Sequence, residues 1–270
     1  MSYSNFHSHT VFCDGECTAE EMVCAAIARG SPALGLSGHS PLPGDPHWCM
    51  TEQSAARYRA ELERLKAEYG GKIELLMGIE QDYLSETPTD EYDFVIGSLH
   101  LMARGGEVLE VDWHVGRLEE IVTRHYGGDA LAVAEDYYSR LPDMARKIKP
   151  TVVGHFDLIN KFNEGGQLFD TANLRYRRAA TDALAAMLER CRVLEVNTGA
   201  MYRNGRSEPY PQPWLLRELC ARGGEVILSS DSHDTASLCH KFSEMEELLR
   251  SVGFKRRLTL TKNGFSEVSL

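Results

Sequence analysis

The sequence predicts an α/β protein of parallel β/α architecture, and two observations support this. Short apolar runs alternate with longer helical segments along the 270 residues, which is typical of parallel strands joined by helices. Polar residues of metal-ligand type stand at or just past the ends of the apolar runs, where parallel β/α barrels build their active sites. No linker rich in proline or serine divides the chain, so we expect residues 1–270 to form one domain.

The apolar runs predict the strands, and the segments between them predict the helices. Strands are expected at residues 3–6, 33–36, 73–77, 94–96, 152–153, 193–196, 226–228 and 258–260. Helices are expected at residues 18–29, 51–69, 115–147 with a break at 127–128, 171–190, 211–222 and 242–252. The first helix has Thr18 as its N-cap, Glu21 to complete a capping box and Gly30 as its C-terminal stop. A loop rich in proline and glycine covers residues 41–47.

Composition and charge exclude several classes of function. With 43% hydrophobic and 26% charged residues the chain is typical of a soluble globular protein, and its apolar runs are far shorter than a membrane span of about 20 residues. The net charge of −11 argues against a nucleic-acid partner, because phosphate backbones require a basic surface. The polar N-terminus does not resemble a signal peptide, and the seven cysteines include no C-x-x-C pair. We therefore expect a cytoplasmic protein with reduced thiols.

Two histidines, His7 and His9, follow the first predicted strand. Residues i and i+2 of an extended segment point to the same side, so the two imidazoles are placed to share one cation. Neutral imidazole is a good ligand for zinc, manganese and iron. A single pair of this kind is weak evidence, because such pairs are common by chance. Its significance depends on what stands at the ends of the other strands.

Further residues of ligand type stand at the ends of the other predicted strands. They are His39, Glu80, His100, His155, Asn197, Asp231 and His233. With His7 and His9, six of the ten histidines fall at strand ends, which random placement does not produce. The set exceeds the four ligands or so of one tetrahedral metal, so we expect two or three divalent transition metals, with Glu80 a candidate bridge. Asp14, in an Asp-Gly turn, is a further candidate ligand, although this dipeptide is also a common turn.

Seven short motifs at these strand ends occur in a fixed order between residues 7 and 233. They are His7-Ser8-His9, Gly38-His39, Gly78-Ile79-Glu80, Gly97-Ser98-Leu99-His100, Gly154-His155-Phe156-Asp157, Glu195-Val196-Asn197-Thr198 and Ser230-Asp231-Ser232-His233. This ordered set resembles the polymerase and histidinol phosphatase (PHP) family. The resemblance implies a distorted (β/α)7 TIM-like barrel with a trinuclear metal site at the C-terminal ends of the strands. One departure is Gly38, where many family members have aspartate; this position is not among the implied ligands.

Carried over position by position, the resemblance implies a ligand set for each metal. The first metal uses His7, His9, Glu80 and Asp231, the second uses Glu80, His100 and His155, and the third uses Asp14, His39 and His233. Histidine and carboxylate ligands suit Mn, Fe, Zn or Co. The implied activity is hydrolysis of L-histidinol phosphate to L-histidinol and phosphate, a step of histidine biosynthesis, through attack by a hydroxide that bridges two metals.

A phosphate group also needs cationic side chains beyond the metals. Lys161, after the fifth predicted strand, and Arg203, after the sixth, are the candidates, because arginine offers a bidentate fork and lysine a point charge. His47, in the second loop, is a candidate to contact the substrate or to protonate the leaving alcohol. Asp231 is a candidate to handle a proton in addition to binding metal.

Two other classes of function stay open at this point. One is a phosphoesterase of the same family that acts on another small phosphate ester or on a nucleotide, which kinetics on a panel of esters would separate. The other is a non-catalytic metal-binding module with a degenerate site, which would be expected to lack ligands, whereas the set here is complete. We expect a small phosphorylated substrate and neither a nucleic-acid nor a membrane partner; the oligomeric state is left open.

Overall fold

Eight strands form one sheet in the computed structural model, which describes residues 2–42, 44 and 47–270. The strand order is β1-β2-β3-β6-β7-β8-β9-β10. The strands are β1 (Ala33–Leu36), β2 (Glu74–Asp82), β3 (Phe94–Ser98), β6 (Val152–Val153), β7 (Val193–Asn197), β8 (Glu225–Ser229), β9 (Arg256–Thr261) and β10 (Gly264–Ser269). Neighbours from β1 to β9 are parallel, and β10 is antiparallel to β9. The C-terminal ends of the parallel strands therefore meet at one face.

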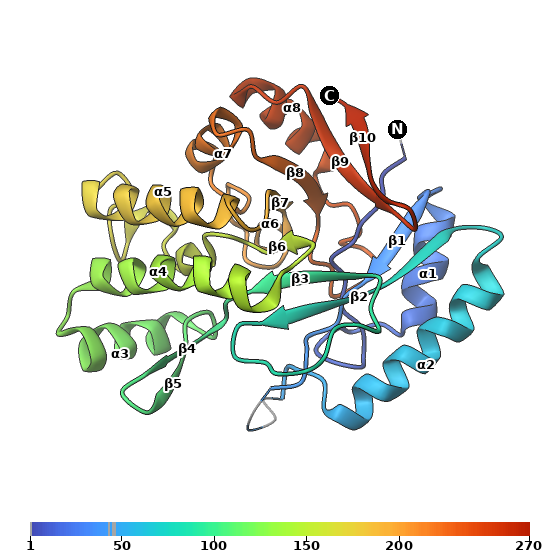
Figure 1. Cartoon of the computed structure of the whole chain (residues 1–270), viewed down its shortest axis with the longest axis horizontal. Coiled ribbons are helices and arrows are strands. Elements are labelled where there is room, and N and C mark those ends of the chain that lie inside the picture. The colour runs from blue at the N-terminus through green and yellow to red at the C-terminus, as the bar shows by residue number, and fades with distance from the viewer. Residues whose placement is uncertain (1, 43, 45–46) are drawn as a thin grey trace.

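Helices surround the strands on the outside (Figure 1). They are α1 (Ala19–Ala28), α2 (Glu52–Tyr69), α3 (Val115–Tyr126), α4 (Ala130–Ile148), α5 (Leu174–Leu188), α7 (Pro213–Ala221) and α8 (Phe242–Val252). The short helix α6 (Gly199–Arg203) instead follows the C-terminal end of β7. The predicted capping box of Thr18 and Glu21 is present, and the predicted break between α3 and α4 lies at Gly127, whose φ of 62° is left-handed. Among the described helices, none combines the length and apolar character needed to cross a membrane.

The N-terminal segment closes the sheet into a barrel by pairing with strands on both sides. Asn5 bridges to Leu34 in β1, and Ser8 bridges to Ser232, just after β8. The backbone N–H of His9 donates to the carbonyl of Ser232 at 2.7 Å. The strand predicted at residues 3–6 is thus a run of isolated bridges and not a regular strand, because its two neighbours contact different parts of it. Together with the parallel strands β1, β2, β3, β6, β7, β8 and β9 it forms a curled parallel sheet, in agreement with the predicted distorted barrel.

Large apolar side chains fill the barrel below the strand ends. The ring of Phe94 lies at the centre of this interior, edge-on to Phe6 with ring centroids 6.2 Å apart. Glycines on two neighbouring strands make room for it: a Cβ at Gly78 would lie 2.2 Å from the Phe94 ring, and one at Gly35 would lie 2.8 Å away. The interior is therefore a packed core on which the polar strand ends rest.

The strand predictions differ from the structure in further places, and β10 is one strand that was not predicted. β2 continues to Asp82, so Glu80 lies within a strand that was predicted to end at residue 77. A hairpin of β4 (Leu101–Arg104) and β5 (Glu107–Glu110) was not predicted at all. Its two-residue turn is formed by Gly105 and Gly106, both with positive φ, which is a recognisable signal for a tight hairpin. This hairpin forms one side of the site described next.

Candidate metal centre

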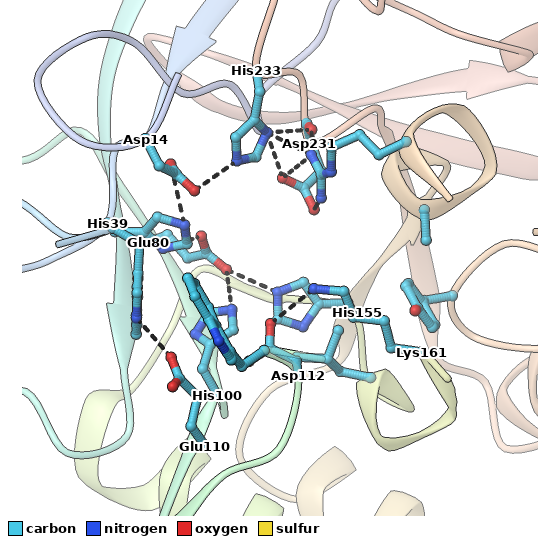
Figure 2. Close-up of a pocket in the computed structure, with 16 residues that line it drawn as sticks. Asp14, His39, Glu80, His100, Glu110, Asp112, His155, Lys161, Asp231 and His233 are labelled. Atoms are coloured by element: carbon cyan, nitrogen blue, oxygen red, sulfur yellow. Dashed lines mark hydrogen bonds and ion pairs between the residues drawn. The ribbon is translucent and has the colours of Figure 1, made fainter. Parts of the chain in front are cut away.

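Glu80 lies at the centre of a ring of imidazoles contributed by different strand ends (Figure 2). Its Oε2 is 3.1 Å from Nε2 of His7 and 2.9 Å from Nδ1 of His39. Its Oε1 is 2.9 Å from Nε2 of His155 and 3.4 Å from Nε2 of His100. Oε2 also lies 3.5 Å from Nε2 of His9, so one buried carboxylate contacts five histidines.

A second group gathers around Asp14, nearer the opening of the site. The Asp14 carboxylate is 3.1 Å from Nε2 of His233 and 3.6 Å from Nε2 of His39. The ring of His9 stacks on that of His233 with centroids 4.2 Å apart. One nitrogen or oxygen from each of these four residues lies within 4.8 Å of the others, a spacing at which a single metal ion can be held.

Asp231 joins this arrangement from the end of β8. Its Oδ1 is 3.2 Å from Nε2 of His9, and its Oδ2 accepts a hydrogen bond of 3.1 Å from Arg203. The backbone of Asp231 is left-handed, with φ of 45°, which is unusual for a residue other than glycine. Gly199 allows the close approach, because a Cβ there would lie 2.8 Å from the Cβ of Asp231. The structure therefore brings all nine predicted metal-ligand residues to one place.

Several ligand atoms of this centre are buried without a hydrogen-bond partner. Within the described residues these include Nε2 of His7, Nε2 of His9 and Oε2 of Glu80. Unpartnered polar atoms are costly in a protein interior, and here they point toward one another. Close groupings of candidate ligands occur around His7 with His9 and Glu80, around His39 with Glu80 and His100, and around Asp14. The donor set therefore fits divalent metal ions.

Burial and mutual attraction act in opposite directions on the charges of the centre. Burial lowers the pKa of His7, but the carboxylates of Glu195 and Glu80 raise it well above its usual value. Burial raises the pKa of Glu80, but His7 and His39 hold it well below its usual value. Burial is the main reason that the pKa of His9 falls to about 3. The carboxylates around His7 therefore favour a positive charge at this place, which a bound cation would supply.

Two buried carboxylates that the sequence analysis did not include among the site residues hydrogen-bond to the candidate histidine ligands. Glu195, inside β7, accepts from Nδ1 of His7 at 2.8 Å and from the backbone N–H of His155 at 2.6 Å. Asp82 accepts from the backbone N–H of His100 at 2.9 Å and lies 3.3 Å from its Nδ1. Such contacts fix the ring orientation and tautomer of a metal-binding histidine. An acidic residue inside an otherwise apolar strand was the sequence signal for Glu195.

A cavity of about 240 Å³ opens above the centre. Both predicted phosphate-binding residues line it: Lys161 is held by Asp112, with Nζ 3.3 Å from Oδ2, and Arg203 is held by Asp231. Trp48 and Trp113 form an aromatic part of the wall. The space thus has candidate metal ligands at its base and two cationic side chains at its side.

His47 is the one predicted site residue that the structure brings neither to the grouped candidate ligands nor to this cavity. It is exposed, and its ring lies 4.8 Å from the ring of Trp113. It is not among the described residues that line the cavity.

We therefore expect His47→Gln to change kcat by no more than about twofold, whereas loss of a general acid costs about 10²-fold or more. The pH profile of kcat for the wild type and the variant measures this. A drop of that size below the alkaline limb, with loss of the alkaline limb itself, would instead identify His47 as the proton donor.

The closed sheet and the grouped ligands define a class: β/α barrels with a histidine and carboxylate centre at the strand ends that fits divalent metals. Comparison with known proteins narrows this class. The model of the PHP domain family matches residues 5–199. The chain belongs to this family.

Related proteins match over nearly the whole length. A protein of Deinococcus radiodurans named "Probable histidinol-phosphatase" is 30% identical over 258 residues, which cover 92% of each chain. The histidinol-phosphatase of Bacillus subtilis is 26% identical over 92% of this chain and 99% of the relative. The crystal structure of histidinol phosphate phosphatase from Lactococcus lactis, in complex with zinc, L-histidinol and phosphate, aligns with a TM-score of 0.72 and 22% identity over 98% and 99% of the two chains. These likenesses confirm the predicted family and the predicted barrel.

Proposed function

We propose that this protein is a metal-dependent phosphomonoesterase that hydrolyses L-histidinol phosphate to L-histidinol and phosphate. The observation that carries the proposal is the position of the buried ligand centre at the base of a cavity that also holds Lys161 and Arg203. A multiply charged centre beside two cations suits a phosphate ester better than a neutral substrate. The names of the relatives and the ligands in the Lactococcus lactis structure support histidinol phosphate as that ester.

The proposed metal sites follow the groups around Glu80, Asp231 and Asp14. We propose one metal on His7, His9, Glu80 and Asp231, a second on Glu80, His100 and His155, and a third on Asp14, His39 and His233. The contacts of both Glu80 oxygens with imidazoles support its role as a bridge. Bound divalent metals lower the pKa of a water molecule toward neutrality and offset the charge of phosphoryl oxygens. Zinc, manganese, iron and cobalt all suit these ligands.

The remaining residues of the proposal bind the phosphate and handle a proton. Arg203, with a guanidinium that also hydrogen-bonds to Asp231, and Lys161, with a point charge, both line the same cavity. The Asp231 carboxylate, held between His9 and Arg203, is placed to accept a proton from an attacking water. The proposal places the reaction in the cytoplasm. The seven cysteines all lie among the described residues and form no disulfide there, which is in keeping with a reducing compartment.

Removal of metal tests the proposal directly. We expect chelation to lower phosphate release from histidinol phosphate by about 10³-fold or more, and added Mn, Fe, Zn or Co to restore it, because the water and the phosphate both depend on the cations. Elemental analysis should find up to three metals per chain in the active form.

Two outcomes would contradict the proposal in different ways. Full turnover by protein shown to be metal-free would exclude metal-dependent hydrolysis. Turnover of other phosphate esters or nucleotides, with none of histidinol phosphate, would leave a metal-dependent phosphatase with a different substrate.

A further inference from the structure

The β4–β5 hairpin places an acidic residue on the wall of the cavity. Glu110, the last residue of β5, lines the cavity on the side away from His233 (Figure 2). The indole N–H of Trp48 donates to its Oε1 at 2.8 Å. The ring of Trp48 in turn lies 4.9 Å from that of His39 and 5.4 Å from that of His100. Glu110 is thus held close to the metal centre by a single aromatic side chain.

The charge of Glu110 is not neutralised by the protein. Its neighbour Asp112 also lines the cavity, but Asp112 forms an ion pair with Lys161. Glu110 accepts from a neutral indole, and no basic side chain in the described part of the chain forms an ion pair with it. An uncompensated carboxylate on a partly enclosed wall favours a cation in the space beside it.

The shape of the cavity determines which part of a substrate meets this carboxylate. When the phosphate lies between the grouped ligands, Lys161 and Arg203, the remaining lining that the alcohol half of the ester can meet includes Trp48, Trp113 and Glu110. Flat indole rings beside a carboxylate are a favourable environment for an ammonium or imidazolium group. L-Histidinol carries both a primary amine and an imidazole.

We propose that Glu110 is a specificity-determining residue that binds a positively charged nitrogen of the alcohol half. This inference rests on the proposed phosphatase function and adds the chemical class of substrate that the cavity selects. An ester of a neutral alcohol would cover the Glu110 carboxylate without giving it a partner. Sites that lose a buried polar partner in this way discriminate strongly against the substrate lacking it.

Glu110→Gln tests the proposal, because glutamine keeps the oxygen that accepts from Trp48 and removes only the charge. With histidinol phosphate we expect kcat/KM to fall about tenfold or more, mainly through KM, as for loss of a charge-assisted hydrogen bond. With n-propyl phosphate, an ester of a neutral alcohol, we expect no loss. Glu107→Gln is the matched control, since Glu107 lies on the same strand but is exposed; it should behave as the wild type with both esters.

Two further esters identify the nitrogen. Glu110→Gln should impair phosphoethanolamine if Glu110 binds the amine, and 3-(imidazol-4-yl)propyl phosphate if it binds the imidazole. An equal loss with histidinol phosphate and n-propyl phosphate, or no loss with either, would overturn the proposal. Calorimetric titration of metal-loaded protein with L-histidinol tests the role of Glu110 in binding even if no ester is hydrolysed. Weaker binding by Glu110→Gln supports the role of Glu110, and unchanged binding refutes it.

Discussion

Glutamine in place of Glu80 is expected to remove most of the bound metal and to lower phosphatase activity by about 10³-fold or more, because metal-assisted catalysis is lost as a whole. Both oxygens of Glu80 face imidazoles, with Nε2 of His7 at 3.1 Å and Nε2 of His155 at 2.9 Å. A neutral amide has one weak ligand oxygen and cannot bridge two cations. Elemental analysis of the purified variant and single-turnover phosphate release measure the two effects.

The matched control for this substitution lies on the same strand. Glu74→Gln makes the same chemical change at the opposite end of β2, far from the ligand centre, and should retain metal and activity. Circular dichroism of both variants establishes that the barrel has formed. If folded Glu80→Gln kept its full metal content and turnover, Glu80 would not be a metal ligand.

Substitution of Glu195 is expected to weaken metal binding, although Glu195 is not itself a proposed metal ligand. Its carboxylate accepts from Nδ1 of His7, from the backbone of His155 and from the amide of Asn197. In Glu195→Gln an NH2 group replaces one accepting oxygen, so one of these donors loses its partner and the His7 ring loses its fixed orientation. We expect metal affinity to fall about 10- to 100-fold, the usual cost of removing a carboxylate behind a histidine ligand.

A competition titration with a chromogenic chelator measures this affinity. Because Glu195 acts through His7 and His155, excess metal should restore most of the activity of Glu195→Gln, while Glu80→Gln should not recover. Glu225→Gln, on the adjacent strand β8 and in an ion pair with Arg256, is the control for the same change outside the centre. Unchanged metal affinity in Glu195→Gln would show that the carboxylate has no positioning role.

The proximity of the candidate ligands at strand ends could be predicted because parallel topology brings strand ends together, whereas Asp14 lies in a turn and was assigned to a metal through the family resemblance. His7, His100 and His155 are far apart in the sequence, yet each follows an apolar run, and parallel strands with outer helices leave their C-terminal ends at one face. Which oxygen of Glu80 meets which imidazole could not be predicted, because this depends on the register between β2 and its neighbours. The sequence pattern also placed Glu80 after its strand, whereas β2 continues to Asp82.

The residues that line the wall of the cavity were harder to predict from the sequence. Glu110 lies in a hairpin that was overlooked because its strands are only four residues long, although Gly105-Gly106 is a recognisable turn signal. Glu195 lies inside an apolar strand, and the sequence does not show on which side of the strand its side chain lies. In the structure the side chain points inward and contacts His7. His47 was considered for its residue type alone, and a loop position carries little information about direction.

The closure of the barrel by the N-terminal segment has a consequence for folding during synthesis. Ser8 pairs with Ser232, so His7 and His9 reach their positions only after most of the polypeptide has left the ribosome. Contacts of such high sequence separation form late and slowly. A nascent chain that has not yet extended past β8 therefore contains both histidines but lacks the segment around Ser232 against which they are positioned.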